Sequence, residues 1–159
     1  MSHEPQGYLA LVLHTHLPFV RHPECDEFLE ERWLFEAITE TYLPLLERFH
    51  RLAEDKIPFR ITMSLTPTLL AMLADPLLQA RYLRHLERLI ELADKELGRT
   101  REQAAFHALA QFYHRRFTTA RRQFAERYRC NLIAPFRELM ERGYLELITS
   151  AATHVYLPL

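Results

Sequence analysis

Three histidines stand where apolar segments of the sequence end. His14 and His16 follow the apolar run of residues 8–13, and His154 follows a third apolar segment at residues 144–150. In a β-strand, residues two apart point to the same face, so His14 and His16 are expected to project together. Imidazoles can bind a divalent metal ion, with a carboxylate supplied from elsewhere, or they can donate to and accept from sugar hydroxyls. The residue types leave both chemistries open.

A single histidine at such a position is usually one that caps a loop by hydrogen bonding. An H-x-H pair with a third histidine at an equivalent strand end favours a functional site, because active sites of parallel α/β folds gather at the carboxyl ends of strands. Trp33 is the only tryptophan and lies early on the helix expected after the first strand. Its ring could stack on the apolar face of a pyranose, or it could pack in the core of an amphipathic helix.

The elements that would position these side chains alternate between strands and helices. The continuous apolar run 8–13 is typical of a strand that is covered on both faces of a parallel sheet. Residues 59–65 alternate polar and apolar side chains and predict a second strand, and residues 144–150 predict a third. Helical patterns fill the segments between them. The sequence therefore predicts an α/β fold with parallel strands.

The starts of the helices are indicated by capping residues and prolines. Asp26 is expected to cap a helix that continues to about residue 55, with a kink or restart at Pro44. Two later helices are expected at Thr66-Pro67 and Asp75-Pro76, where a capping residue is followed by proline at the first helical position.

The helix ends are indicated by glycines. The helix that starts at Pro76 is expected to end at Leu97, with Gly98 in the left-handed conformation. Further helices are predicted over residues 100–128 and 132–142, and Gly143 is expected to end the second of them.

The composition excludes several classes of function. Hydrophobic residues make up 48% and charged residues 26%, and the net charge of −1 gives no field toward nucleic acid or an anionic membrane. Cys25 and Cys130 lack CxxC spacing, which favours a reducing cytoplasm over a disulfide framework. Signal-peptide features and long apolar stretches are missing, so no membrane is expected. With three glycines, a phosphate-cradling loop is not possible, and no cofactor is implied.

One basic stretch stands against this balanced background. Residues 112–129 contain six arginines and one glutamate, with aromatic residues between them; the arginines are Arg115, Arg116, Arg121, Arg122, Arg127 and Arg129. An RNA-binding helix can show this pattern, and so can an amphipathic helix with a solvated basic face. The balanced charge of the rest of the chain favours the solvated face, so nucleic acid is not expected as a partner.

Three segments resemble signature regions of glycoside hydrolase family 57. Residues 11–20, LVLHTHLPFV, resemble the first signature region, and residues 31–40, ERWLFEAITE, resemble the helix that follows it. Residues 143–154, GYLELITSAATH, resemble the second region. The combination of HTHLP and SAATH is similar to the α-1,4-glucan branching enzymes of the family, whereas other members tend to carry HQP at the first region. The resemblance extends over the whole chain.

The resemblance implies a (β/α)₇ barrel with parallel strands, of which residues 1–159 would be the N-terminal, incomplete part. It implies a retaining double displacement on α-glucans such as amylose or glycogen, with a glutamate nucleophile and an aspartate acid/base. In the family these carboxylates lie on later strands, so they are expected beyond Leu159. The residues Glu36, Glu40 and Glu146 are therefore not assigned as the nucleophile. The 159-residue chain is expected to be inactive by itself. The enzyme to which it belongs is expected to be cytoplasmic.

The resemblance also implies roles for residues that the chain does contain. His14, His16 and His154 would be ligands of the reacting sugar, and Trp33 would stack on it, with neither a metal nor a cofactor. Three alternatives remain open. The enzyme could be an amylase or 4-α-glucanotransferase of the same family. It could be a metal-dependent carbohydrate hydrolase or deacetylase that uses His14 and His16. The basic helix could also belong to a non-catalytic binding module.

Overall fold

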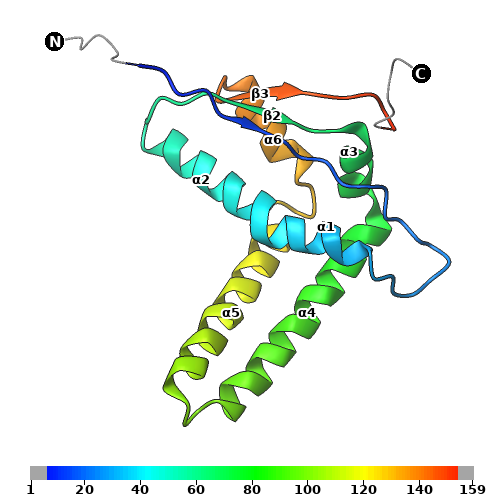
Figure 1. Cartoon of the computed structure of the whole chain (residues 1–159), viewed down its shortest axis with the longest axis vertical. Helices are drawn as coiled ribbons and strands as arrows, with labels where there is room; N and C mark the ends of the chain where they lie inside the picture. Colours follow the sequence, from blue (N-terminus) through cyan, green and yellow to red (C-terminus); the bar gives the residue numbers. More distant parts are fainter. Residues whose placement is uncertain (1–6, 154–159) are drawn as a thin grey trace.

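The fold is built on a small parallel sheet. The structure, a computed structural model, describes residues 7–153. In that part of the chain, β1 (Val12–Leu13), β2 (Ile61–Ser64) and β3 (Leu145–Ile148) lie side by side in the order β1-β2-β3, as Figure 1 shows. Val12 is opposite Thr62, and Thr62 is opposite Glu146. The predicted α/β class with parallel strands is confirmed.

The first crossover connection contains a helix with an irregular turn. It consists of α1 (Glu31–Ala37), the π-helix η1 (Ile38–Tyr42) and α2 (Leu43–Glu54). Pro44 is in the first turn of α2. Its ring and missing amide proton disfavour a regular turn before it, and the wider π-turn lies immediately upstream. The predicted restart at Pro44 is confirmed.

The second crossover connection is longer and forms a helical hairpin. It consists of α3 (Pro67–Ala74), α4 (Pro76–Arg99), α5 (Ala104–Arg122), the π-helix η2 (Gln123–Arg127) and α6 (Ile133–Glu141). The helices α4 and α5 run antiparallel and project away from the sheet (Figure 1). No helix in residues 7–153 combines the length and the apolar character that crossing a membrane requires.

Two of the predicted helix starts are confirmed by their capping contacts. The hydroxyl of Thr66 accepts a hydrogen bond from the amide of Leu69 at 3.4 Å. The Asp75 carboxylate accepts hydrogen bonds from the amides of Leu77 at 2.8 Å and Leu78 at 3.1 Å. Each cap satisfies amide groups in the first turn of its helix, which have no partner within the helix.

Two of the predicted boundaries are wrong. Asp26 does not cap α1, which begins later in the chain and has Glu30 at its N-cap position. Gly98 lies inside α4, which ends after Arg99, where the hydroxyl of Thr100 donates to the Glu96 carbonyl at 2.6 Å. A hydroxyl near the last turn thus replaces the expected left-handed glycine. Gly143 does end α6 as predicted, with φ of 80°.

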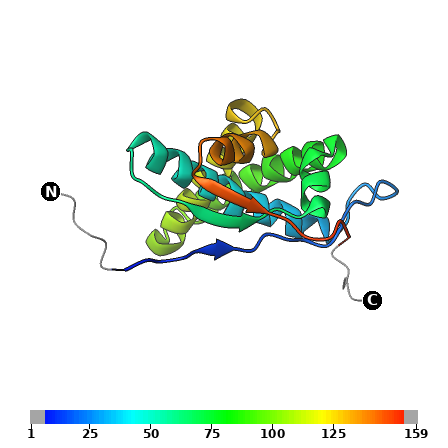
Figure 2. The ribbon, with the colours of Figure 1, turned by 90° about the horizontal axis from the view of Figure 1, so that it is seen from above.

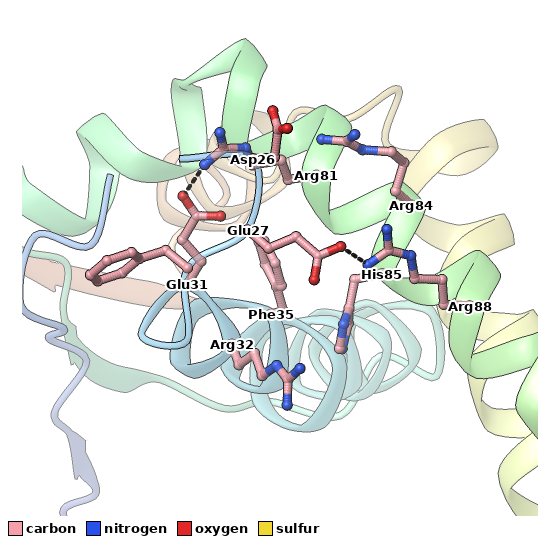
Figure 3. Close-up of a pocket in the computed structure, with 10 residues that line it drawn as sticks. Asp26, Glu27, Glu31, Arg32, Phe35, Arg81, Arg84, His85 and Arg88 are labelled. Atoms are coloured by element: carbon pink, nitrogen blue, oxygen red, sulfur yellow. Dashed lines mark hydrogen bonds and ion pairs between the residues drawn. The ribbon is translucent and has the colours of Figure 1, made fainter. Parts of the chain in front are cut away.

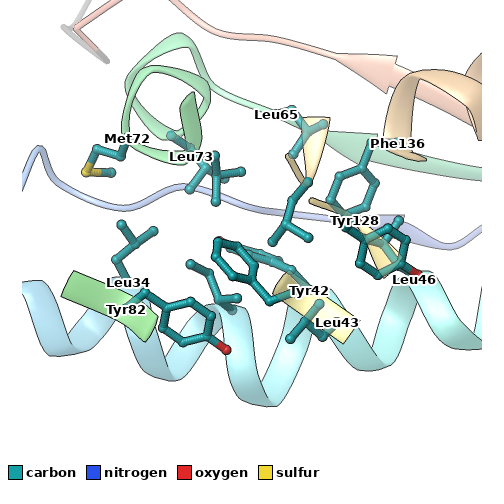
Figure 4. Packing of buried hydrophobic residues seen from close by; sticks show 14 of the residues in the cluster. Leu34, Tyr42, Leu43, Leu46, Leu65, Met72, Leu73, Tyr82, Tyr128 and Phe136 are labelled. Carbon is teal, nitrogen blue, oxygen red and sulfur yellow. The ribbon is translucent and has the colours of Figure 1, made fainter. Parts of the chain in front are cut away.

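The helices lie on one side of the sheet, as Figure 2 shows. The face turned toward them is apolar, with Met63 0% and Leu145 3% exposed. Side chains from the helices complete the core around this face, and Figure 4 shows part of the cluster. Among its fully buried members are Leu46, Leu69, Tyr82, Leu86, Phe136 and Leu139.

The first strand is shorter and more exposed than predicted. Only Val12 and Leu13 form β1, and Tyr8 and Leu9 are 92% and 82% exposed. The prediction of a strand covered on both faces is wrong for this chain. The reason is that β1 lies at the edge of the sheet and the helices cover one face only, so the apolar run 8–13 has no second layer here.

Candidate active site

His14 and His16 lie directly beyond the end of β1. Their ring centroids are 6.4 Å apart and the ring planes are tilted by 44°. Residues two apart in an extended segment share a face, and Val12, the preceding residue of this series, is exposed on the side of the sheet that the helices leave open. The two imidazoles therefore project together from the carboxyl end of the sheet.

Two hydroxyl side chains, one at the end of β2 and one at the N-cap of α3, orient the two rings. Nδ1 of His14 lies 3.2 Å from the Ser64 hydroxyl, and Nδ1 of His16 lies 3.1 Å from the Thr66 hydroxyl. These pairs continue the parallel register in which Leu13 is opposite Met63. Because Ser64 is 8% and Thr66 0% exposed, each ring is hydrogen-bonded to a side chain that the fold holds in place.

Side-chain contacts also fix the backbone between the two histidines. The amide of Thr15 donates to the Ser64 hydroxyl at 2.9 Å, and the Thr15 hydroxyl donates to the Ser64 carbonyl. Thr15 is buried, with 6% exposure. The regular backbone ladder between β1 and β2 ends at Leu13, so these contacts continue the connection between the two segments. A rigid support of this kind is what a binding site needs to hold a ligand in one geometry.

The supporting residues Thr15, Ser64 and Thr66 were not predicted from the sequence. A signal was present, because Ser64 and Thr66 repeat at the end of the second strand the i, i+2 spacing of His14 and His16. Parallel strands of equal length bring their carboxyl ends together, so two series with the same spacing form matching pairs. The prediction would have required the register of the strands, which the sequence alone does not state.

Of the other predicted site residues, the structure places Trp33. It lies in the first turn of α1, is 49% exposed and is not part of the buried cluster. The interpretation of Trp33 as a core residue is therefore wrong, and its role as a stacking residue stays a prediction. His154 lies outside the described residues.

A buried ion pair anchors the segment that connects the histidines to α1. Arg81 of α4 pairs with Glu31, the first residue of α1, and the side chains are 6% and 2% exposed. Arg81 also donates to the backbone carbonyls of His22, at 3.0 Å, and Cys25. Figure 3 shows a pocket whose lining includes the Glu31–Arg81 pair and the more exposed pair of Glu27 with Arg88. The start of α1, and with it Trp33, is thereby tied to α4.

The three glutamates that were not assigned as the nucleophile differ in their settings. Glu36 and Glu40 are exposed residues of α1 and η1. Glu146 lies on the open face of β3 and accepts a hydrogen bond from the Thr62 hydroxyl at 2.6 Å. This cross-strand pair is an exposed contact between residues that are opposite each other in the sheet. The position agrees with the interpretation of Glu146 as a structural or exposed residue.

The described residues do not assemble a metal site. Within residues 7–153, no three histidine, cysteine, aspartate or glutamate side chains come together as metal ligands do. Nδ1 of His14 and Nδ1 of His16 are each within hydrogen-bond distance of a hydroxyl group. The part of the chain that the structure describes therefore offers two imidazoles as candidate metal ligands, and a metal ion would need its other ligands from elsewhere.

The basic stretch lies on α5, on η2 and in the turn that follows. Arg121 forms an ion pair with Glu87 of α4 at 3.2 Å. Arg115, Arg122, Arg127 and Arg129 are exposed. One of the arginines thus connects the two helices of the hairpin, and most of the others lie at the surface.

Comparisons with known proteins agree with the sequence motifs. Residues 10–159 match the family model of glycosyl hydrolase family 57. The chain is 39% identical over 159 residues to a 1,4-α-glucan branching enzyme of Thermococcus kodakarensis, an alignment that covers 97% of this chain and 22% of that protein. A crystal structure of that GH57 branching enzyme in complex with glucose and additives aligns with a TM-score of 0.81 at 38% identity, covering 96% of this chain and 27% of that one.

Two further solved structures are similar. The α-amylase AmyC from Thermotoga maritima aligns with a TM-score of 0.86 at 49% identity, covering 94% of this chain and 28% of that one. A GH57-type branching enzyme from Pyrococcus horikoshii aligns with a TM-score of 0.87 at 38% identity, covering 96% of this chain and 28% of that one. The chain thus spans less than a third of the length of each of these proteins.

Proposed function

Because the chain belongs to glycosyl hydrolase family 57, we propose that it supplies the histidine-bearing part of the active site of an α-glucan branching enzyme. The observation that carries the proposal is the pair His14 and His16, whose rings project together and are hydrogen-bonded to the hydroxyls of Ser64 and Thr66. Sugar hydroxyls both donate and accept, so imidazoles held in fixed orientations are suitable partners for them.

The proposed reaction is a retaining transfer that forms α-1,6 branches on an α-1,4-glucan such as amylose or glycogen. His14, His16 and His154 bind the reacting sugar, and Trp33 stacks on a glucose ring. The glutamate nucleophile and the aspartate acid/base belong to parts of the enzyme outside these 159 residues. The chain then forms the N-terminal portion of a (β/α)₇ catalytic barrel in a cytoplasmic enzyme.

Hydrolysis of α-glucans is the second candidate function. It is favoured by the 49% identity to an α-amylase, which is higher than the 39% identity to a branching enzyme. The two reactions share the first displacement and differ in whether water or a sugar hydroxyl attacks the glycosyl-enzyme intermediate. A 4-α-glucanotransferase would differ again by forming an α-1,4 bond.

The proposal can be tested with a chimera. This chain replaces the aligned segment of the Thermococcus kodakarensis branching enzyme, and the products formed from amylose are analysed for α-1,6 bonds and for new reducing ends. We expect branches from the chimera and none from the 159-residue chain alone. In the chimera, His14→Ala should lower the branching rate by about tenfold or more, the effect of losing one or more hydrogen bonds in the transition state.

Several outcomes would contradict the proposal. New reducing ends without branches would favour hydrolysis, and branching by the isolated chain would show that it contains its own carboxylates. A chimera whose His14→Ala variant is fully active would remove His14 from the site. Circular dichroism of each variant provides the control for folding, and Phe19→Ala, which truncates an exposed side chain three residues beyond His16, serves as the matched substitution.

A further inference from the structure

A second polar hollow lies among the helices. It is an open depression of about 440 Å³ between α2, α6 and the segment after η2. His50, Glu54, Tyr128 and Glu138 are among its lining residues, and neither His14 nor His16 is. In volume it falls within the usual range of small-molecule sites. The hollow is therefore a candidate site distinct from the carboxyl end of the sheet that carries His14 and His16, which we call the rim.

Tyr128, one of the residues that line the hollow, carries a buried hydroxyl group. This hydroxyl has no hydrogen-bond partner among residues 7–153, and Tyr128 as a whole is buried, with 9% exposure. The ring of His50, also 9% exposed, stacks against the Tyr128 ring with centroids 6.4 Å apart. A buried hydroxyl without a partner destabilises a fold, and such groups call for a specific explanation. A ligand hydroxyl would provide the missing partner.

The backbone beside the hollow is irregular in two ways. The π-helix η2 ends at Arg127, directly before Tyr128. Arg129 and Cys130 then have φ of 49° and 61°, in the left-handed region that residues other than glycine rarely adopt. Isolated π-turns and consecutive strained residues concentrate at functional sites. Here they determine how Arg127 and Tyr128 are presented to the hollow.

The charges around the hollow are balanced. Arg127 and Arg142 contribute two positive charges, and Glu54 and Glu138 contribute two negative charges. Arg142 and Glu138 are hydrogen-bonded to each other at 3.0 Å.

The buried imidazole adds no charge to this balance. Burial lowers the pKa of His50, the two arginines lower it further, and the two glutamates oppose them. The imidazole is therefore neutral near pH 7. A hollow with donors and acceptors but no net charge fits a neutral polyhydroxylated ligand better than an anion.

We propose that this hollow binds a glucose unit of an α-glucan at a site separate from the histidine rim. The identity of the sugar rests on the function proposed above. In this complex the Tyr128 hydroxyl and the His50 ring contact the sugar. The two arginines of the lining donate to the sugar hydroxyls, and the two glutamates accept from them. A second point of attachment raises the effective concentration of the same glucan chain at the rim.

The variant Tyr128→Phe tests the proposal because it removes only the hydroxyl. Without sugar, Tyr128→Phe should melt at the same or a higher temperature, since a buried group without a partner is removed. With maltotetraose as the probe, binding at the hollow should weaken roughly three- to tenfold, the effect of one hydrogen bond. Calorimetry gives the affinity, and NMR shifts of the Tyr128 and Asn131 amides locate it. A residue with a purely structural role would not change affinity while preserving stability.

Matched variants separate this proposal from the proposed function. Glu54→Gln changes an exposed carboxylate of the same hollow and should also weaken binding there, whereas His14→Ala should leave the shifts at the hollow unchanged. Maltotetraose shifts at the rim alone would overturn the second site and leave the proposed function intact. Shifts at neither site would overturn the second site, while the proposed function is judged by the branching activity of the chimera. Inorganic phosphate shifting the hollow where maltotetraose does not would identify an anion site and overturn the proposal.

Discussion

The two faces of the three-stranded sheet carry different kinds of residue. Toward the helices, Met63 and Leu145 are almost completely buried and apolar. On the open face, the neighbouring residues Thr62 and Glu146 form a polar pair across the strands. Because side chains alternate along a strand, residues that are adjacent in sequence belong to different environments. Apolar packing and polar contacts are thereby assigned to alternate positions of the same strands.

The division between the faces changes near the carboxyl ends of the strands. Ser64 belongs to the same series as Thr62 but is 8% exposed, because Thr15 is bonded to it. The open face thus becomes closed where it supports His14. Near His14, buried backbone and hydroxyl contacts between Thr15 and Ser64 hold the open face in place, whereas the contact between Thr62 and Glu146 remains exposed.

The largest effect expected from this comparison is on the covered face. Met63→Ala should lower the free energy of unfolding by about 2–5 kcal/mol, because a fully buried side chain is removed and a cavity remains. Thr62→Ala, one residue away on the open face, should cost at most about 1 kcal/mol. Urea denaturation of the two variants measures the difference directly. Equal losses would show that the open face contributes to stability as much as the covered face does.

An intermediate effect is expected at Asp75, which caps α4 on the helical side. Burial raises the pKa of this carboxyl, but hydrogen bonds from the Leu78 amide, Arg21 and the Leu77 amide outweigh it and hold the pKa below its usual range. The Arg21 contact measures 2.5 Å. A folded-state pKa below the unfolded value gives stability that is present above the unfolded pKa, near 3.8, and is lost as pH falls through the folded one.

The substitution Asp75→Asn keeps a capping oxygen and removes the charge. It should lower the free energy of unfolding by about 1 kcal/mol at pH 7, with the difference from wild type shrinking below pH 4. Guanidinium or thermal unfolding at several pH values measures this, and Glu36→Gln, an exposed helical carboxylate, is the matched control. A difference that stays constant down to pH 2 would mean that the charge of Asp75 does not stabilise the fold.

Local signals explain what could be predicted from the sequence. The caps at Thr66 and Asp75, the restart at Pro44 and the end at Gly143 each depend on residues within one turn. The exposure of residues 8–13 could not be predicted, because an apolar run does not state whether a second layer is present to cover it. Gly98 shows the same limitation, since the hydroxyl of Thr100 ends α4 two residues later.

The candidate site could be predicted only in part for a similar reason. His14 and His16 follow from spacing within one strand, and their shared side is a local property. Their partners Ser64 and Thr66 lie 50 residues away from them and depend on the register between two strands. The anchor of α1, Glu31 with Arg81, also spans 50 residues and involves two charges that the sequence alone does not pair.

The smallest effect on stability is expected at Glu146, where it is most informative for the comparison of the faces. Its hydrogen bond to Thr62 is exposed, so Glu146→Gln should change the free energy of unfolding by less than about 0.5 kcal/mol. If the open face serves chemistry only where His14 and His16 project, the same variant in the chimera should keep most of its branching activity. Glu146→Ala is the companion variant, because it removes the hydrogen-bond acceptor as well as the charge.

A nucleophilic carboxylate would behave differently, because replacing it with an amide removes the group that forms the glycosyl-enzyme bond. A rate loss of about 1,000-fold or more in Glu146→Gln, at unchanged stability, would therefore place Glu146 in the reaction and contradict its interpretation as a structural residue. A loss of a few-fold would instead mean that the Thr62 contact helps to align β3 with β2. Measuring the rate and the unfolding free energy on the same preparation separates these cases, since alignment affects both quantities and chemistry affects only the rate.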